Sequence, residues 1–212
     1  MQRSSERGSL SSEIYERLKT RILSFEIPAG TPLVENSLVE EFGVSRTPVR
    51  AALQMLRNEG LVQFRENMGA AVSAPSFRKV VETYSVRELL CPYAARLAAA
   101  HASDEKLAEL RERLDKPSAD ATGPGQRIEC ETANRFFHSA ILEIAGNETL
   151  REIGERLLWV TQQVSVDLPP QSFMESKEEH LEVLRALFDH DQDAAEQAMR
   201  RHIVNSRNRC FE

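Results

Sequence analysis

The sequence is poor in cysteine and has no long apolar segment. Its three cysteines, Cys91, Cys130 and Cys210, are odd in number and far apart, which argues against a disulfide framework and indicates reduced thiols. No apolar run approaches the roughly 18 residues that a membrane helix needs. Residues 1–7 also lack the apolar core of a signal peptide. We therefore expect a cytoplasmic protein with no membrane partner.

The chain also has no excess of positive charge. A net charge of −6 argues against a general nucleic-acid binder. The charge is unevenly distributed, however: residues 1–79 hold 11 Lys and Arg against 9 Asp and Glu, whereas residues 80–212 hold 16 against 24. A length of 212 residues is enough for two small domains. This asymmetry indicates one domain that touches DNA and a second, acidic domain that does not.

Three helices are predicted near the start of the chain. Apolar residues at helical spacing indicate a first helix that begins at Ser11 or Ser12, and we expect residues 1–9 before it to form a flexible arm. A short second helix is predicted over residues 35–42. Gly43 then makes the turn to a third helix.

A predicted hairpin completes this domain. Ser45 is the predicted N-cap of the third helix, and Gly60 ends that helix. Two short strands are expected over residues 61–64 and 70–73, around a turn that contains Asn67 and Gly69. The order of a helix, a helix-turn-helix and a hairpin predicts a winged helix-turn-helix domain over residues 10–75.

The start of the third helix has the residues that a DNA-reading helix needs. Arg46 and Arg50 are four residues apart and project from one side, and arginine donates two parallel hydrogen bonds to guanine. Ser45 and Thr47 suit phosphate oxygens. Gly69 lets the hairpin approach a sugar-phosphate backbone closely. The alternative is that the two arginines only solvate an exposed helix face.

The rest of the chain is helical in pattern. After a short linker at residues 74–76, apolar residues recur at helical spacing, and prolines, glycines and asparagines separate the segments. The fold class is therefore mostly α, with a bundle of about six helices after the winged domain. The predicted helices are 77–101, 104–115, 126–145, 147–166, 173–189 and 191–208.

Three of the five histidines lie on apolar helix faces. A buried imidazole needs a partner for its nitrogens, and His138, His180 and His202 could find one in a shared metal ion. Asn134, one turn before His138, adds a carbonyl oxygen. Three nitrogens and one oxygen suit zinc, nickel or a similar divalent ion. The alternative is three separately satisfied core histidines. The other two, His101 and His190, are expected at the surface.

Arg87 is expected to face the interior of the bundle, on a side that it shares with Cys91. A buried arginine needs an anion, and a ligand carboxylate can accept both of its parallel hydrogen bonds. An internal salt bridge is the alternative. Cys91 is either a small buried thiol or a redox sensor.

Five segments of the N-terminal domain follow the pattern of a known family: ILS at 22–24, IPAG at 27–30, LVE at 33–35, FGVSRTPVR at 42–50 and LQMLRNEGLV at 53–62. With them, residues 10–75 resemble the DNA-binding domain of GntR-type bacterial transcription regulators. The resemblance implies that Arg46, Thr47 and Arg50 contact DNA. Asn36 stands where the family usually has an arginine that also touches DNA, and Ala51 stands where a glutamate is usual.

The helical domain carries a second set of such segments: YSVRELL at 84–90, AARLAA at 94–99, NRFFH at 134–138, AGN at 145–147, EH at 179–180 and HI at 202–203. Residues 77–212 resemble the all-helical FCD effector domain of the FadR branch of that family.

The resemblance implies a dimerising domain that holds a metal ion and, on it, a small carboxylate effector. The implied metal ligands are Asn134, His138, His180 and His202, and Arg87 is implied to face the effector. Asn134 replaces the more usual aspartate, which weakens a cation site, and Cys91 replaces a glutamate.

The sequence thus predicts a ligand-responsive transcription regulator rather than an enzyme. We expect a cytoplasmic homodimer that binds a palindromic double-stranded DNA operator, acts as a repressor, and responds to a small carboxylate bound at a zinc or nickel site. One alternative is a regulator whose metal is sensed directly or is structural. A remote alternative is a metal-dependent hydrolase, against which no acidic residue accompanies the histidines in a hydrolase-like motif.

Overall fold

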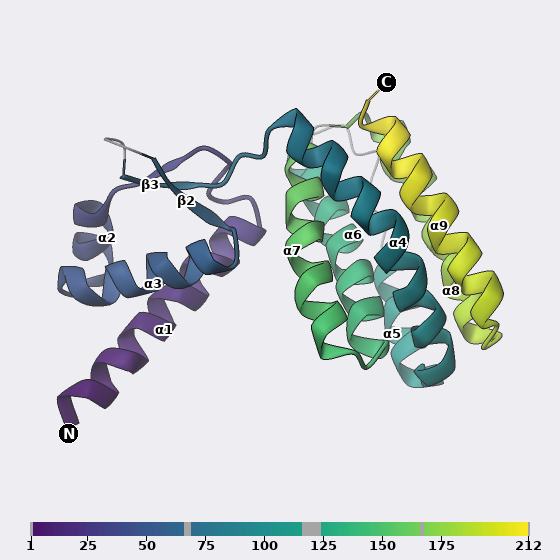
Figure 1. Cartoon of the computed structure of the whole chain (residues 1–212), viewed down its shortest axis with the longest axis horizontal. Coiled ribbons are helices and arrows are strands. Elements are labelled where there is room, and N and C mark those ends of the chain that lie inside the picture. The colour runs from purple at the N-terminus through teal and green to yellow at the C-terminus, as the bar shows by residue number, and fades with distance from the viewer. Residues whose placement is uncertain (1, 66–68, 116–123, 166–167, 212) are drawn as a thin grey trace. The chain divides into compact units, whose positions relative to one another are not determined.

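The computed structural model describes residues 2–65, 69–115, 124–165 and 168–211, with side chains from residue 10 onward. It divides into two compact units, Met1–Ala74 and Pro75–Glu212, which are coloured from purple to blue and from teal to yellow in Figure 1. None of the described helices is both long and apolar enough to span a bilayer.

Three helices form most of the first unit: α1 (Gln2–Leu23), α2 (Glu35–Phe42) and α3 (Arg46–Asn58). The buried face of α1 contains Ile14, Leu18 and Ile22, which are at most 2% exposed, and α1 packs on α3. The prediction of a flexible arm over residues 1–9 is wrong for the backbone, because α1 begins at Gln2. The segment has no proline, and a single glycine costs a helix only about 1 kcal/mol.

A three-stranded antiparallel sheet completes the unit. The hairpin strands β2 (Val62–Arg65) and β3 (Gly69–Val72) pair with Val62 opposite Val72. A further strand, β1 (Pro32–Leu33), pairs with the other edge of β3, so the order is β1-β3-β2. The sequence predicted the hairpin but not β1. Asn67, expected in the hairpin turn, lies outside the described residues.

The second unit is a bundle of helices, as the sequence predicted. The observed ends differ from the predicted ends by at most three residues. The core between the helices includes Tyr84, Phe137, Ile141 and Leu184, which are at most 1% exposed, and α4 and α9 lie side by side in Figure 1. The helices are α4 (Phe77–His101), α5 (Asp104–Asp115), α6 (Pro124–Ile144), α7 (Glu148–Ser165), α8 (Pro170–Phe188) and α9 (Gln192–Arg209).

Helix α4 continues through a proline because α9 supplies the missing hydrogen bond. Pro92 has no N–H, so the carbonyl of Glu88 one turn earlier loses its helical donor. The Arg200 guanidinium of α9 donates to that carbonyl at 3.0 Å. The interior proline therefore helps to hold α4 and α9 together.

Candidate functional site

The predicted DNA-reading residues lie exposed at the start of α3. Arg46, Thr47 and Arg50 are all at the surface, where their side chains are accessible to a DNA groove. Ser45 occupies the N-cap position with extended backbone, but its side chain makes no capping hydrogen bond with the described residues of α3. The prediction of Ser45 as the N-cap residue is therefore confirmed in position, but no capping hydrogen bond of its side chain accompanies it within the described part of α3. Both the hydroxyl and the first N–H groups of α3 are left to donate hydrogen bonds to a phosphate.

Arg50 has a partner that the sequence did not indicate. Its Nε lies 2.8 and 3.0 Å from the two carboxylate oxygens of Glu35, the first residue of α2. The Arg50 side chain is 65% exposed, so this ion pair is in water and weak. Asn36 follows Glu35 and is exposed, as is Ala51. The pair holds Arg50 in place without removing it from the surface.

Gly69 begins β3 on the far side of the hairpin turn. It is exposed and has a φ of +75°, a left-handed conformation that favours glycine over residues with a Cβ. The hairpin therefore needs glycine here for its backbone geometry, whether or not DNA approaches it.

Three buried histidines meet inside the second unit. His138 of α6, His180 of α8 and His202 of α9 are at most 4% exposed. The Nε2 of His202 lies 3.1 Å from the Nε2 of His138 and 3.2 Å from that of His180. Among the residues that the structure describes, these three form the group whose ligand atoms all lie within 4.8 Å of one another. The alternative of three separately satisfied histidines is therefore wrong.

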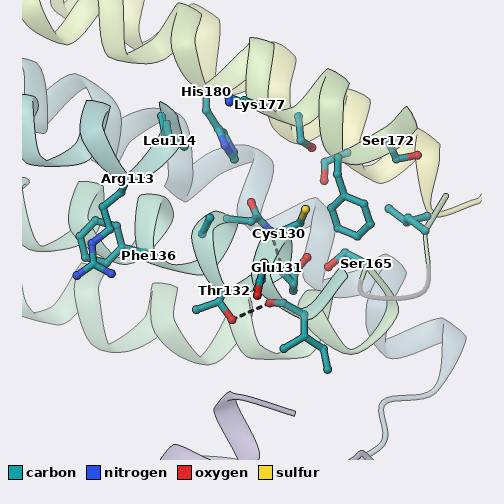
Figure 2. Close-up of a pocket in the computed structure, with 18 residues that line it drawn as sticks. Arg113, Leu114, Cys130, Glu131, Thr132, Phe136, Ser165, Ser172, Lys177 and His180 are labelled. Carbon is teal, nitrogen blue, oxygen red and sulfur yellow. Dashed lines mark hydrogen bonds between the residues drawn. The ribbon is translucent and has the colours of Figure 1, made fainter. Parts of the chain in front are cut away.

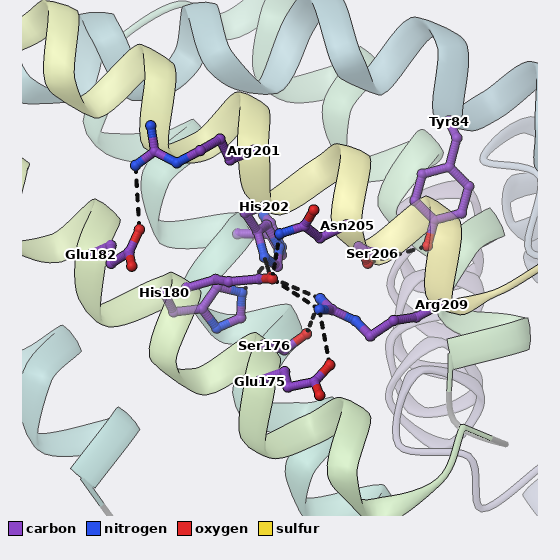
Figure 3. Close-up of polar contacts among 12 residues, drawn as sticks. Tyr84, Glu175, Ser176, His180, Glu182, Arg201, His202, Asn205, Ser206 and Arg209 are labelled. Atoms are coloured by element: carbon purple, nitrogen blue, oxygen red, sulfur yellow. Dashed lines mark hydrogen bonds and ion pairs between the residues drawn. The ribbon is translucent and has the colours of Figure 1, made fainter. Parts of the chain in front are cut away.

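A carboxylate fixes the orientation of His202. Glu179 Oε2 lies 2.8 Å from His202 Nδ1, so the neutral ring carries its proton on Nδ1 and turns an unprotonated Nε2 toward the other histidines. Arg209 and Asn205 of α9 in turn donate to Glu179, with distances of 2.7 to 2.9 Å. Figure 3 shows Arg209 and Asn205 beside His202, with Arg209 also reaching Ser176 on α8.

The surroundings keep the histidines neutral and Glu179 ionised. Burial lowers the pKa of His138 and His180 well below the usual value, and the nearby Arg87 charge adds to this. Burial also lowers the pKa of His202, although Glu179 opposes it. For Glu179, burial favours the neutral form, but the hydrogen bonds from Arg209 and His202 outweigh it and hold the pKa well below its usual range. Neutral imidazoles are the form that binds metal ions.

The fourth predicted ligand, Asn134, lies one turn before His138 and is half-buried. Its Nδ2 donates to Glu131 Oε1 at 2.8 Å, which leaves Oδ1 as its cation-binding atom. Burial raises the pKa of Glu131 to about 7, against the opposing effects of Asn134 and of neighbouring polar groups.

A cavity of about 350 Å³ opens beside Asn134 and His180. Figure 2 shows Cys130, Glu131 and Ser165 around it, with Arg113 stacked on Phe136. The Arg113 guanidinium lies 4.1 Å from the centre of that ring. A volume of this size is enough for a small metabolite.

Arg87 is not among the residues that line this cavity. It lines a second, much smaller cavity with Cys91 and His138. Arg87 is 4% exposed and donates to the Thr161 hydroxyl. No carboxylate of the described residues lies within ion-pair distance of its guanidinium, so the alternative of an internal salt bridge is not found there. Its charge still lowers the pKa of all three histidines.

The remaining histidines and the cysteines lie outside the cluster. His101 and His190 are both exposed, as predicted, and the His190 ring contacts the carbonyl of Ala99 at 2.9 Å. All three cysteines, each within the described residues, are free thiols, and Cys91 is half-buried.

The donor set of the cluster fits a divalent cation. Nitrogens that surround a tetrahedral zinc at 2.0–2.1 Å lie roughly 3.3 Å apart, close to the 3.1 and 3.2 Å between the Nε2 atoms. The chain combines a winged helix-turn-helix unit with a helical unit that has a polar internal centre. This combination is typical of DNA-binding transcription regulators with a separate sensing domain.

Comparison with known families identifies the chain within this class. Residues 10–72 match the gntR family of bacterial regulatory proteins, and residues 82–205 match the FCD domain. The chain belongs to the GntR family and carries an FCD domain after its DNA-binding domain. These families are DNA-binding transcriptional regulators and not enzymes, which excludes the hydrolase alternative.

Individual proteins agree with this assignment. The HTH-type transcriptional repressor RspR of Escherichia coli is 29% identical, over 92% of this chain and 86% of its own length. A probable D-xylose utilization operon transcriptional repressor of Paenarthrobacter nicotinovorans is 27% identical, over 93% and 87%. E. coli McbR/YncC has the same fold, with a TM-score of 0.79 and 24% identity over 95% of this chain and 97% of that chain.

Proposed function

We propose that the protein is a transcriptional repressor that acts as a homodimer on a palindromic operator and responds to a small carboxylate metabolite bound at a zinc or nickel site in the helical domain. The single observation that carries the sensing part is the cluster of His138, His180 and His202, whose nitrogens converge although nothing in a purely structural core requires it. Repression is supported by the names of the relatives. Such a protein works in the cytoplasm, where the bacterial chromosome lies.

The helical domain offers a carboxylate two positive centres. A divalent ion held by the histidines and Asn134 Oδ1 would bind a carboxylate oxygen directly. Arg87 is a buried cation that forms no ion pair within the described residues, and its charge acts on all three histidines and on Glu131. An anion that enters beside the cluster would offset the cost of burying Arg87.

The outer face of α4 supports the homodimer. Val86, Leu89 and Tyr93 recur at i, i+3 and i+7 on one side of the helix, and their exposed fractions are 40%, 67% and 48%. Large apolar side chains in a row on a surface are typical of an interaction site. A second copy of the chain, which places two winged domains on a twofold axis, would cover this row and match the two half-sites of a palindrome.

The DNA part is tested on DNA selected from a random pool by the wild-type protein. We expect Arg46→Ala and Arg50→Ala each to weaken binding roughly 10- to 100-fold, because a base-reading arginine contributes about 1–3 kcal/mol. Arg111→Ala removes an exposed arginine of α5 and is the matched control, with unchanged affinity. Unchanged footprints in both α3 variants would overturn the proposal.

The sensing part is tested by thermal shift of the purified protein against mono-, di- and tricarboxylates, with and without chelator. A carboxylate shift that disappears on chelation and in His180→Ala supports the metal-bridged effector. A metal-dependent change in operator affinity without any carboxylate shift favours the alternative in which the metal itself is sensed. A melting temperature that depends on metal while DNA affinity does not favours a structural metal.

A further inference from the structure

The large cavity of the helical unit contains a buried carboxyl oxygen without a partner. Glu131 of α6 is 1% exposed, and it lines the cavity together with Asn134 and His180 (Figure 2). Its Oε1 accepts the hydrogen bond from Asn134, whereas its Oε2 has no partner within hydrogen-bond distance in the described part of the chain. The side chains of Ser165 and Gln162 lie near enough to lower the pKa of Glu131 but do not pair with Oε2. A buried acceptor left unpaired is costly. An unpaired oxygen in the wall of a ligand-sized cavity therefore points to a ligand that donates to it.

Glu131 is outside the proposed metal centre. The described group with converging ligand atoms contains His138, His180 and His202 and no carboxylate. Glu131 instead reaches the cluster through Asn134, whose amide it orients. Its free oxygen is thus available to a ligand that fills the cavity, which Asn134 and His180 of the proposed metal centre also line.

The charges around the cavity decide which kind of donor suits this oxygen. An ammonium group would lie near the proposed divalent ion and near Arg113 and Lys177, which both line the cavity. A hydroxyl avoids that repulsion. The hydroxyls of Ser165 and Ser172, buried in the same wall, can both donate and accept hydrogen bonds, so the wall suits a ligand that carries hydroxyl groups.

We propose that the effector is a hydroxycarboxylate and that Glu131 selects it, with Oε2 accepting a hydrogen bond from the effector's hydroxyl. This inference rests on the proposed function, because it assumes that a carboxylate binds at the histidine cluster. An acid without the hydroxyl leaves Glu131 Oε2 unpaired inside the filled cavity, and that loss is the source of the discrimination.

The experiment measures dissociation constants by calorimetry for the full-length protein with added Zn²⁺, using three pairs of acids: malate and succinate, citrate and tricarballylate, lactate and propionate. We expect at least one pair in which the hydroxylated member binds roughly 10- to 100-fold more tightly, the range expected when the other member leaves a buried acceptor unpaired. In Glu131→Met, which keeps the length of the side chain, the two members should bind within about twofold of each other. Glu143→Met, an exposed position on the same helix, is the control and should keep the preference.

Each outcome decides a different claim. Equal binding of both members in the wild type, or a preference that survives in Glu131→Met, overturns the role of Glu131 but leaves the carboxylate site standing. Binding of none of the six acids overturns the proposed carboxylate effector, and the selection with it. If Glu131→Met does not fold, as judged by circular dichroism, Glu131→Leu replaces it, and the wild-type pairs already provide a test that needs no variant.

Discussion

The contact between Glu179 and His202 leads to a quantitative prediction about metal affinity. The carboxylate holds the His202 proton on Nδ1 and so presents Nε2 as a ligand. In Glu179→Gln the side chain keeps its shape but loses its charge, and the ring becomes both less basic and less firmly oriented. Removing such a partner from a metal-bound histidine costs 10- to 100-fold in metal affinity, which corresponds to about 1.4–2.7 kcal/mol.

The assay is a competition between the protein and a chromophoric chelator for Zn²⁺. Glu182→Gln is a matched control, because Glu182 also links α8 to α9 through an arginine, Arg201, at 3.3 Å, but contacts no histidine. Glu179 also binds Arg209, so the variant should lower the free energy of unfolding without metal. A urea titration of the metal-free protein measures this loss of folding stability separately from the change in zinc affinity. Zinc affinities of Glu179→Gln and Glu182→Gln that agree within twofold would refute the reasoning.

Three further perturbations have definite expected results. Glu35→Gln should free Arg50 and raise operator affinity by up to about fivefold, since an exposed ion pair contributes about 0–1 kcal/mol; weaker DNA binding in a gel-shift titration would contradict this. Arg87→Met should lower carboxylate affinity at least about tenfold, because it removes the buried positive charge proposed to face the effector; equal affinity in the variant and the wild type by calorimetry would contradict this. Leu89→Asp should convert the proposed dimer to a monomer in sedimentation velocity, because it places a charge in the apolar row on α4; a dimer with wild-type affinity would show that the interface lies elsewhere.

Most of the fold could be predicted from the sequence because its helices are long and periodic. The predicted and observed ends of α4 and α5 coincide, because prolines, capping residues and apolar spacing all indicate the same helix ends there. Strand β1 could not be predicted, because a strand of two residues is too short to show an alternation of apolar and polar side chains. Pro32 also argues against a strand. The helical start of α1 was also missed, since residues 2–9 include no apolar side chain that could reveal a helical period.

The three histidines that meet in the structure could be singled out from the sequence, but the carboxylates beside them could not. His138, His180 and His202 could be found because imidazoles on apolar faces are rare. Glu131 and Glu179 could not, because they are two of 33 acidic residues and only the packing of the bundle shows that one is buried and that the other faces a histidine. The same holds for the Glu35–Arg50 pair, whose members are 15 residues apart on different helices.

Strand β1 also has a mechanical consequence. It ties the segment just before α2 to β3, so the helix-turn-helix and the hairpin share one sheet edge and cannot slide against each other without breaking backbone hydrogen bonds. The spacing between α3 and the β2–β3 hairpin is therefore fixed by the backbone of this unit. An operator bound by both α3 and the hairpin would have to match that fixed spacing.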